Sequence, residues 1–297
     1  MKYPFGVLWC LFSIFIFGVA SAQNIPAPSA SIADLPGGKV QAFIVQGNVS
    51  LVDKDGKQSS LKRGQVFGEG VVIKAGRGSS ALLVFSNGVV LKILENCQIS
   101  VDQFKQVLFD EKSEGTYLQL KKDPSKSVVT LDLRNARAEI VAPALDDAAG
   151  SSFTINSPAG SFSVHEGIFS ISVVRNSAGQ VAKILGNSYV GMLSTVLSGA
   201  ASKTTSTTKR PNALLPESQI QTHLNVDPIT GAIVNPDVID ARIPQDYSQK
   251  AIDAIYASLN SARADNSLGP LPPPKASPPT QPAGWLSMDF DPDTGPP

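Results

Sequence analysis

Short runs of apolar residues, separated by turn-forming residues, recur along the chain from Lys39 to about residue 195. Several runs alternate apolar and polar positions, which is typical of strands that bury one face. The segment "VQAFIVQGNVSLVDKDGKQSSLKRG" predicts two strands on either side of the "DKDG" turn, and "SVVTLDLRNARAEIVA" predicts a strand with Val129, Leu131 and Leu133 on one face. We therefore expect a mainly β fold over residues 39–195, an antiparallel β-sandwich or a short β-roll.

The segment "LLVFSNGVVLKIL" predicts a hairpin around Asn87-Gly88, because this dipeptide favours two-residue hairpin loops. With that loop, Val84 would pair with Leu91 and Leu82 with Ile93. One buried face would then carry these four residues: Leu82, Val84, Leu91 and Ile93. The other face, with Leu83, Phe85, Val90 and Lys92, would be partly covered at most. Packing explains this stretch without any chemistry.

The segment "SFSVHEGIFSISVVRNSAGQVAKIL" predicts a second hairpin at Glu166-Gly167 and a third at "NSAG". In the second hairpin Val164 would pair with Phe169, and Phe162 with Ile171. The opposite face would carry Ser161, Ser163, His165, Ser170 and Ser172. Such a face is either solvated or a polar binding strip.

The alternating pattern ends near Ser198. Residues 196–245 are expected to form a linker and irregular region, with one small hairpin in "HLNVDPITGAIVNPDVI". Residues 246–264 predict a helix, because Tyr247, Ala251, Ile255 and Leu259 form one apolar stripe that can dock on the β domain. Residues 265–297 form a Pro-rich, acidic tail that is expected to stay outside the core.

The N-terminus predicts export. Lys2, an apolar run from Phe5 to Val19 and the small residues around Ala22 have the form of a signal peptide, residues 1–22, that is cleaved after Ala22. The alternative is an uncleaved anchor, although the run is short for a bilayer span. Residues 23–38 form a flexible lead-in. We expect a periplasmic or secreted protein with no stable membrane span after cleavage.

Composition narrows the partners. The 297 residues include 25 basic and 25 acidic side chains and form no basic stripe, which argues against nucleic acid. Cys10 lies inside the predicted signal peptide, so Cys97 is the one cysteine expected in the exported chain. A lone cysteine among apolar strand residues usually packs as a small hydrophobic side chain.

No constellation of residues predicts catalysis. His165 and His223 are the two histidines, and neither has a nearby metal-ligand partner in the sequence. The alternation of Asp289, Asp291 and Asp293 resembles a calcium loop, but the glycine comes one position late and no glutamate follows, so a turn or acidic tail fits better. Trp285 is either an adhesive contact residue or an exposed aromatic. We therefore predict no catalytic, cofactor-binding or metal residue, no cofactor, and no enzyme.

The stretch from Val45 to Val173 resembles a FecR-type domain. The resemblance rests on "VQGNVSL", "LKRGQVFGEGVVIKAGRGSSALLVFSNGVVLKI", "LRNARAEIV" and "FTINSPAGSFSVHEGIFSISV". The matching positions are Gly47, Gly64, Gly70, Ser80, Phe85, Gly88, Ser157, Pro158 and Gly167. Glu166 and Ile168 replace the arginine and threonine that the family carries in its closing motif. The resemblance implies an all-β fold and an extracytoplasmic location in a bacterium, and it implies regulation only through a separate membrane protein.

We conclude from the sequence that the chain is a non-catalytic, exported binding or scaffold module of the bacterial cell envelope. Its partner would be an envelope protein or a surface polymer, and its exposed strand edges leave the oligomeric state open. The first alternative is a periplasmic sensing component that acts with a separate membrane regulator. The second is a hydrolase acting on a glycan or peptide, which a deep cleft with two facing carboxylates would favour.

Overall fold

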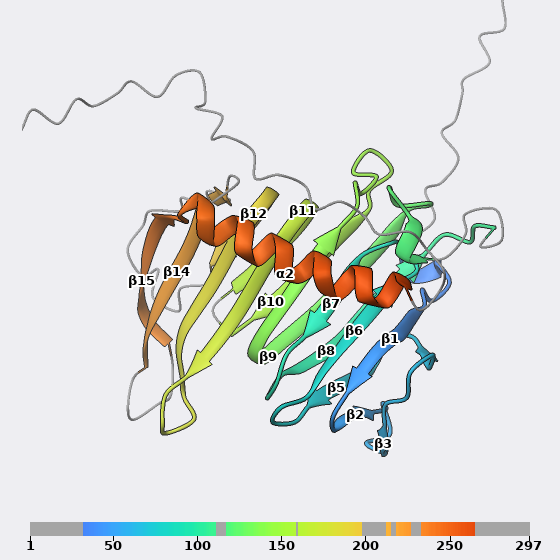
Figure 1. Ribbon diagram of the computed structural model, residues 1–297, viewed down its shortest axis with the longest axis horizontal. Helices are drawn as coiled ribbons and strands as arrows, with labels where there is room; N and C mark the ends of the chain where they lie inside the picture. The colour runs from blue at the N-terminus through green and yellow to red at the C-terminus, as the bar shows by residue number, and fades with distance from the viewer. Residues whose placement is uncertain are drawn as a thin grey trace, which may run out of the picture. The chain divides into compact units, whose positions relative to one another are not determined.

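The strands of the described chain form one sheet that folds over into two layers (Figure 1). The computed structural model describes residues 32–110, 117–158, 160–197, 212–214, 218–226 and 233–264. The mainly β, sandwich-like fold predicted from the sequence is confirmed. The signal peptide and most of the lead-in, the polar linker around Thr205, and the Pro-rich tail lie outside these residues.

The first layer is ordered β4-β1-β6-β7-β9-β11-β12-β14-β15, and it uses the later half of β9 and β11 and the earlier half of β12. Its strands are β1 (Val40–Gln46), β4 (Val66–Phe67), β6 (Ser80–Phe85), β7 (Val90–Ile93), β9 (Ser127–Ala142), β11 (Gly160–Arg175), β12 (Val181–Leu197), β14 (Ser218–Val226) and β15 (Ile233–Arg242).

The second layer is ordered β3-β2-β5-β8-β9-β10-β11-β12-β13, and it uses the other halves of the three long strands. Its remaining strands are β2 (Val49–Val52), β3 (Gln58–Ser60), β5 (Val71–Ala75), β8 (Gln98–Gln106), β10 (Ser152–Ser157) and β13 (Asn212–Leu214). Neighbouring strands are antiparallel except β9 and β10, which run parallel. Short 3-10 helices lie at Ile32–Asp34 and Tyr117–Gln119.

Three long strands bend where they pass from one layer to the other. β9 bends at Ala136, which has a φ of 64°, a left-handed value that is uncommon outside glycine. β11 and β12 bend together at Gly167 and Gly191, which face each other across an irregular stretch of the ladder. These bends connect the two layers, because at each bend one strand leaves the first layer and continues in the second.

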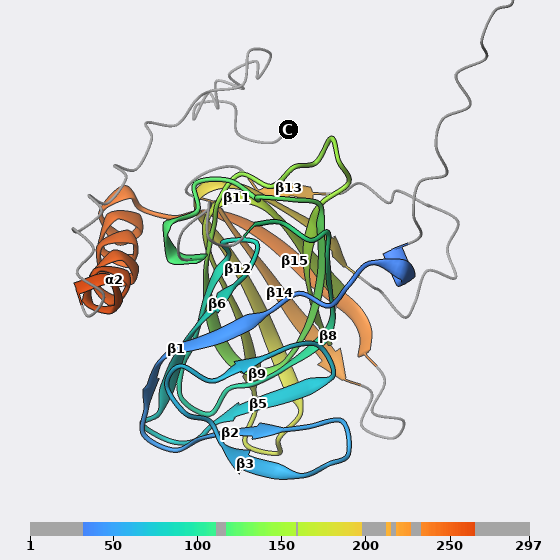
Figure 2. The ribbon, with the colours of Figure 1, turned by 90° about the vertical axis from the view of Figure 1, so that its right-hand side faces the viewer.

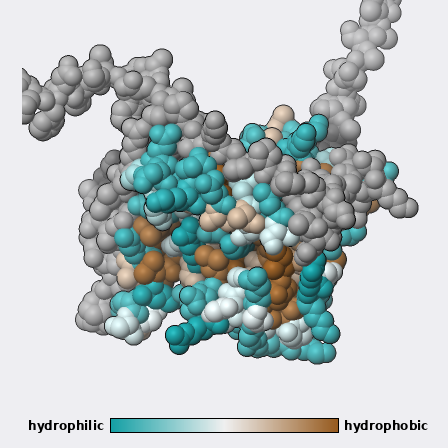
Figure 3. Space-filling view, viewed as in Figure 1, coloured by the Kyte–Doolittle hydropathy of each residue, from teal (hydrophilic) through white to brown (hydrophobic). Residues whose placement is uncertain are grey.

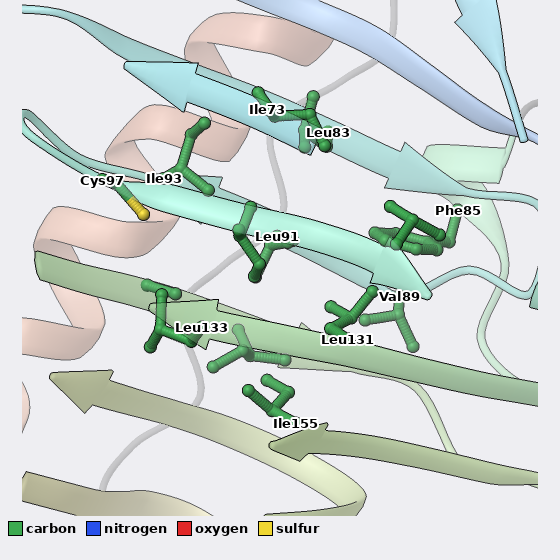
Figure 4. Close-up of a cluster of buried hydrophobic side chains, with 14 of the residues drawn as sticks. Ile73, Leu83, Phe85, Val89, Leu91, Ile93, Cys97, Leu131, Leu133 and Ile155 are labelled. Carbon is green, nitrogen blue, oxygen red and sulfur yellow. The ribbon is translucent and has the colours of Figure 1, made fainter. Parts of the chain in front are cut away.

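The hydrophobic core lies between the two layers. Phe85 and Leu91 face inward from the first layer, and Leu131 and Ile155 meet them from the second (Figure 4). Phe85 packs edge-on against Phe153, with ring centroids 5.4 Å apart. Cys97 lies in this core with 1% of its surface exposed, so it packs as the small hydrophobic residue that the sequence predicted.

The predicted helix forms as α2 (Gln245–Ala264) and covers the outer face of the first layer, on the side away from β8 (Figure 2). Ile252, Ile255 and Leu259 are buried against a second apolar cluster that includes Leu82 and Ile168. Among the described residues no helix is both long and apolar enough to cross a membrane.

The predicted register of the hairpin in "LLVFSNGVVLKIL" is wrong by one residue. The loop has three residues, Ser86 to Gly88, and Val84 pairs with Val90 rather than with Leu91. Gly88 takes a φ of 87°, as the last residue of such loops commonly does. The core face therefore carries Ala81, Leu83, Phe85, Leu91 and Ile93, while Leu82, Val84 and Val90 face α2.

The predicted hairpin at Glu166-Gly167 is also wrong, because β11 continues through these two residues as a single strand. Gly167 takes a φ of 136° at the bend of the strand, not in a turn. Phe162, Val164, Phe169 and Ile171 are buried in the core as expected, but none pairs with another. The hairpin at "NSAG" is confirmed, with Arg175 paired to Val181.

Other elements follow the sequence closely. β2 and β3 pair on either side of the "DKDG" turn, and Val129, Leu131 and Leu133 all point into the core. The hairpin expected near residue 230 forms as β14 and β15. Together with β13 these strands extend the sheet into residues 196–245, which the sequence had assigned to a linker and irregular region.

Candidate functional site

Two rows of hydrogen-bonding side chains cross the outer face of the second layer, opposite the core; we call this surface the polar face. The first row consists of Gln103, Thr130, Thr154, Ser163 and Ser194, each paired with the next across β8, β9, β10, β11 and β12. The second row consists of Ser100, Asp132, Asn156 and Ser161 and reaches β12 at the exposed Val196, which is not a hydrogen-bonding residue. All nine side chains are partly exposed.

The local sequence places these side chains on the polar face through strand alternation. Val129 and Leu131 point into the core on either side of Thr130, and Phe153 and Ile155 do the same beside Thr154. Neighbouring strands lie about 4.8 Å apart, and positions two residues apart along a strand are separated by about 6.7 Å. The polar face is therefore a grid with these two spacings.

Most groups of the first row are free to bind a ligand. Thr130, Thr154 and Ser163 make no side-chain hydrogen bond with any described residue, and each hydroxyl can donate one bond and accept others. In the second row Ser100 Oγ donates to Asp102 Oδ1 at 2.6 Å, and the Asp132 carboxylate pairs with Arg134 at 2.5 Å. The first row is thus uncharged and unpaired over three adjacent strands.

His165 lies beside the first row, two residues from Ser163 on β11, and contacts two residues that are distant in sequence. Its Nδ1 lies 3.2 Å from Asp147 Oδ2, and its Nε2 lies 3.3 Å from Ser194 Oγ. Asp147 belongs to the loop between β9 and β10, while Ser194 belongs to β12. No local sequence pattern predicts this grouping, since 18 residues separate His165 from Asp147 and 29 separate it from Ser194.

The order Asp147–His165–Ser194 matches that of a serine hydrolase triad, but its surroundings do not supply the rest of that machinery. Ser194 lies within a strand that pairs on both sides, with Ser163 in β11 and Ala213 in β13. The neighbouring backbone N–H groups are therefore used in the ladders and cannot stabilise an oxyanion. The side chain of Asp147 is 61% exposed, so water weakens its hold on His165. We interpret the three residues as polar contacts at the border of the polar face.

A different polar cluster lies under α2, on the outer face of the first layer. Arg137 contacts Glu139 at 3.1 Å and donates to Tyr189 Oη at 3.3 Å. Tyr189 Oη also lies 3.0 Å from Ser170 Oγ. Burial raises the pKa of Tyr189, so its hydroxyl stays protonated and available for these bonds. Ser170, which the sequence placed on a solvated face, is thus fully buried.

Lys92 ties this cluster to the helix. Its Nζ donates to Ser258 Oγ of α2 at 2.8 Å and lies 3.6 Å from the Glu139 carboxylate. Lys92, Glu139 and Ser258 therefore fix the position of α2 in addition to its apolar contacts. We assign this cluster a structural role.

A hollow of about 540 Å³ opens between α2 and the bends of β11 and β12. Hydrophobic side chains show beside the helix on this side of the molecule (Figure 3). The hollow is lined by Val141, Ala142, His165, Glu166, Gly167, Ile168, Val190, Gly191 and Tyr256. Glu166 is the one carboxylate among the lining residues, so the hollow does not show the pair of facing carboxylates that the hydrolase alternative predicts.

The remaining residues considered in the sequence fall in three places. Burial raises the pKa of the Cys97 thiol to about 12, which keeps it unreactive. His223 lies in β14, where its backbone pairs with Lys183. Asp289, Asp291, Asp293 and Trp285 lie outside the described residues. Among the described residues no group of three or more His, Cys, Asp or Glu side chains could hold a metal ion.

Comparison with known proteins gives little guidance. No family model and no curated protein matches the chain, so the resemblance to a FecR-type domain stays a prediction. Two crystal structures of a protein from Parabacteroides distasonis, described as a "putative anti-sigma factor", align with TM-scores of 0.39 and 0.38 at 11% identity. The alignment covers 62% of this chain and 64% of theirs. A likeness at this level carries no argument about the function of this chain.

Proposed function

We propose that the chain is an exported, non-catalytic binding or scaffold module of the bacterial cell envelope, and that the polar face is its contact surface. The observation that carries this proposal is the first row of that face. Thr130, Thr154 and Ser163 come from three separate strands, lie in register, and make no side-chain hydrogen bond within the described part of the chain.

A binding role agrees with the rigidity of this surface. The three side chains project from strands whose opposite faces are locked into the core by residues such as Leu131, Phe153 and Phe162, all fully buried. Side chains held on rigid strands lose little freedom on binding, so more of the contact energy remains as affinity. Among the described residues, the backbone around Ser194 is engaged in ladders on both sides, which supports binding over hydrolysis.

The proposal can be tested by photo-crosslinking from a single introduced cysteine. Ser163→Cys would carry a benzophenone label, and Cys97 would not compete for the reagent because its thiol is buried. The matched control is Ser172→Cys, which lies on the same strand but in the first layer, paired with Leu185 and Arg137. Labelled protein is returned to cell-envelope fractions and irradiated.

We expect the Ser163 label to capture an envelope component in larger amount than the Ser172 label does. Equal capture by both labels, or none by the Ser163 label, would overturn the assignment of the polar face. Ser194→Ala should leave any hydrolysis of esters or peptides by the preparation unchanged. Loss of a hydrolytic activity in that variant would reverse our conclusion about catalysis.

A further inference from the structure

We infer that the polar face binds a neutral polysaccharide chain that lies across the strands, along the first row. This inference rests on the proposed function and specifies the chemistry of the partner. It starts from the kinds of side chain on the face, which exclude most other partners.

The polar face lacks the features of a protein-binding surface. The anchors of protein interfaces are most often Trp, Tyr and Arg. The nine side chains of the two rows include no aromatic residue and no arginine. A membrane surface would require an apolar band or a basic cluster, and the first row has neither.

Charge excludes anionic polymers in the same way. The first row carries no ionisable group from Gln103 to Ser194, and the one charge in the second row, Asp132, is negative and pairs with the exposed Arg134 beside it. Binding of nucleic acid or an acidic polysaccharide depends on clustered Lys and Arg. The first row suits a ligand that is uncharged and hydrogen-bonds along its length.

Hydroxyl groups on a polysaccharide meet these requirements. Every hydroxyl donates and accepts, as do the Ser and Thr side chains opposite, so either partner can adapt to the other. The first row crosses five strands and therefore spans about 19 Å. A β-linked sugar chain advances by nearly one strand spacing per ring, so successive rings would meet Thr130, Thr154 and Ser163 in turn.

His165 would border this track along one side. It lies on β11, two residues from Ser163, and its ring is held between Asp147 and the Ser194 hydroxyl of β12. The ring is partly exposed, so it can contact the flank of a bound chain. The pairing of the first row continues past Ser194 to Ala213 of β13, so the imidazole does not close the track.

Affinity electrophoresis of the full chain tests the inference. Native gels would contain a neutral β-linked polymer (β-glucan, xylan or mannan), neutral α-linked dextran, or anionic alginate. We expect at least one β-linked polymer to slow migration equally at low and high salt, since neutral contacts are not screened. Thr154→Val should weaken binding about fivefold, the effect of one neutral hydrogen bond. Thr154→Val with Ser163→Ala should weaken it further, while Ser172→Ala should not.

The outcomes separate this inference from the proposed function. If only alginate slows migration, and high salt abolishes this effect, the ligand is anionic and the inference of a neutral ligand is wrong. If no neutral polymer slows migration but the Ser163 label still captures an envelope component selectively, the polysaccharide inference is wrong. The proposed function as a binding module is then still supported. Thermal unfolding of each variant checks that the substitution has not disturbed the fold. We expect Thr154→Val to fold normally, because valine is well tolerated in strands.

Discussion

The bend shared by β11 and β12 should fail when a single methyl group is added at Gly191. A Cβ built on Gly191 would overlap the carbonyl oxygen of Glu166 in the neighbouring strand, and one built on Gly167 would overlap that of Val190. Both obstacles are backbone atoms, which cannot rotate away. Gly191→Ala must therefore push β11 and β12 apart at the point where they pass between the layers.

The loss of stability expected for Gly191→Ala has two parts, the strain of a left-handed backbone and the displacement of the neighbouring strand. Gly179 provides a control for the first part. Gly191 has a φ of 80° and Gly179, at the tip of the β11–β12 hairpin, has a φ of 77°. Left-handed backbone costs alanine about 1–2 kcal/mol, offset in part by about 0.4–1 kcal/mol of lost freedom in the unfolded chain. A Cβ on Gly179 would meet nothing within 4 Å, so Gly179→Ala should cost about 1 kcal/mol or less.

Gly191→Ala adds the displacement of two paired strands. Separation of the strands breaks ladder hydrogen bonds beside the bend, and the loss of two such bonds would contribute about 1 kcal/mol each. We therefore expect Gly191→Ala to lower the free energy of unfolding by about 3 kcal/mol or more. This is a large share of the free energy of unfolding of a typical domain, which is about 5–15 kcal/mol. Urea denaturation followed by circular dichroism measures both variants. If Gly191→Ala is no less stable than Gly179→Ala, the two glycines do not mark a close approach and our account of the bend is wrong.

Three further predictions concern the core, the helix and one buried carboxyl group. The Cys97 thiol, with its pKa near 12, should not react with a thiol reagent at mildly alkaline pH until the protein unfolds; rapid labelling of native protein would contradict its burial. Ile252→Ala should loosen α2 by about 2–4 kcal/mol, seen as faster hydrogen exchange in the helix, while the exposed control Asp253→Ala should not. Burial raises the pKa of Asp123, whose carboxylate accepts a hydrogen bond from Ser127. A raised native pKa means that the folded state binds the proton more tightly than the unfolded state does. Protonation of Asp123 therefore contributes its full stabilisation below the unfolded pKa of about 3.8, and this contribution is lost as pH rises through the native pKa. We therefore expect the stability of Asp123→Asn relative to the wild type to increase as pH rises from about 3.8 through the native pKa of Asp123. A stability difference that does not change with pH would show that the native pKa of Asp123 is not raised.

The elements that the sequence predicted well are those with local signals. The "NSAG" turn places Gly179 at positive φ, and Asn176 Oδ1 accepts hydrogen bonds from the backbone N–H groups of Ala178 and Gln180. Val129, Leu131 and Leu133 alternate with polar residues, so their shared face was evident. The helix at 245–264 has its own apolar stripe, of which Ile255 and Leu259 are buried as expected while Tyr247 is 50% exposed.

The errors arise where apolar residues occupy both faces of a strand. Leu82 to Phe85 are all buried, the odd-numbered pair in the core and the even-numbered pair against α2. Without alternation, the sequence cannot fix the register, and a slip of one residue exchanges the faces. The Glu166-Gly167 error has another cause, since a glycine at a strand bend and one in a turn look alike in sequence.

The polar face could be predicted only in part. Ser161 and Ser163 were placed opposite the core by their spacing within one strand. Thr130 and Thr154 join them through the parallel pairing of β9 with β10, a long-range contact that no local pattern announces. Likewise Ser170 has the same local setting as Ser163, yet it is buried because Tyr189 bonds to it under α2.

The composition of the polar face argues that it is more than a solvated surface. Sheets that only need to stay soluble commonly carry Lys and Glu on their wet side, which also hinders unwanted contacts. The first row instead carries short, uncharged side chains at Thr130, Thr154, Ser163 and Ser194. Long charged side chains lose about 1.5–2 kcal/mol of conformational freedom each when a partner covers them, whereas serine and threonine lose less. Thr154→Lys should therefore fold normally and remain soluble, yet lose its envelope contact, because solubility tolerates a lysine on this row and close approach of a partner does not.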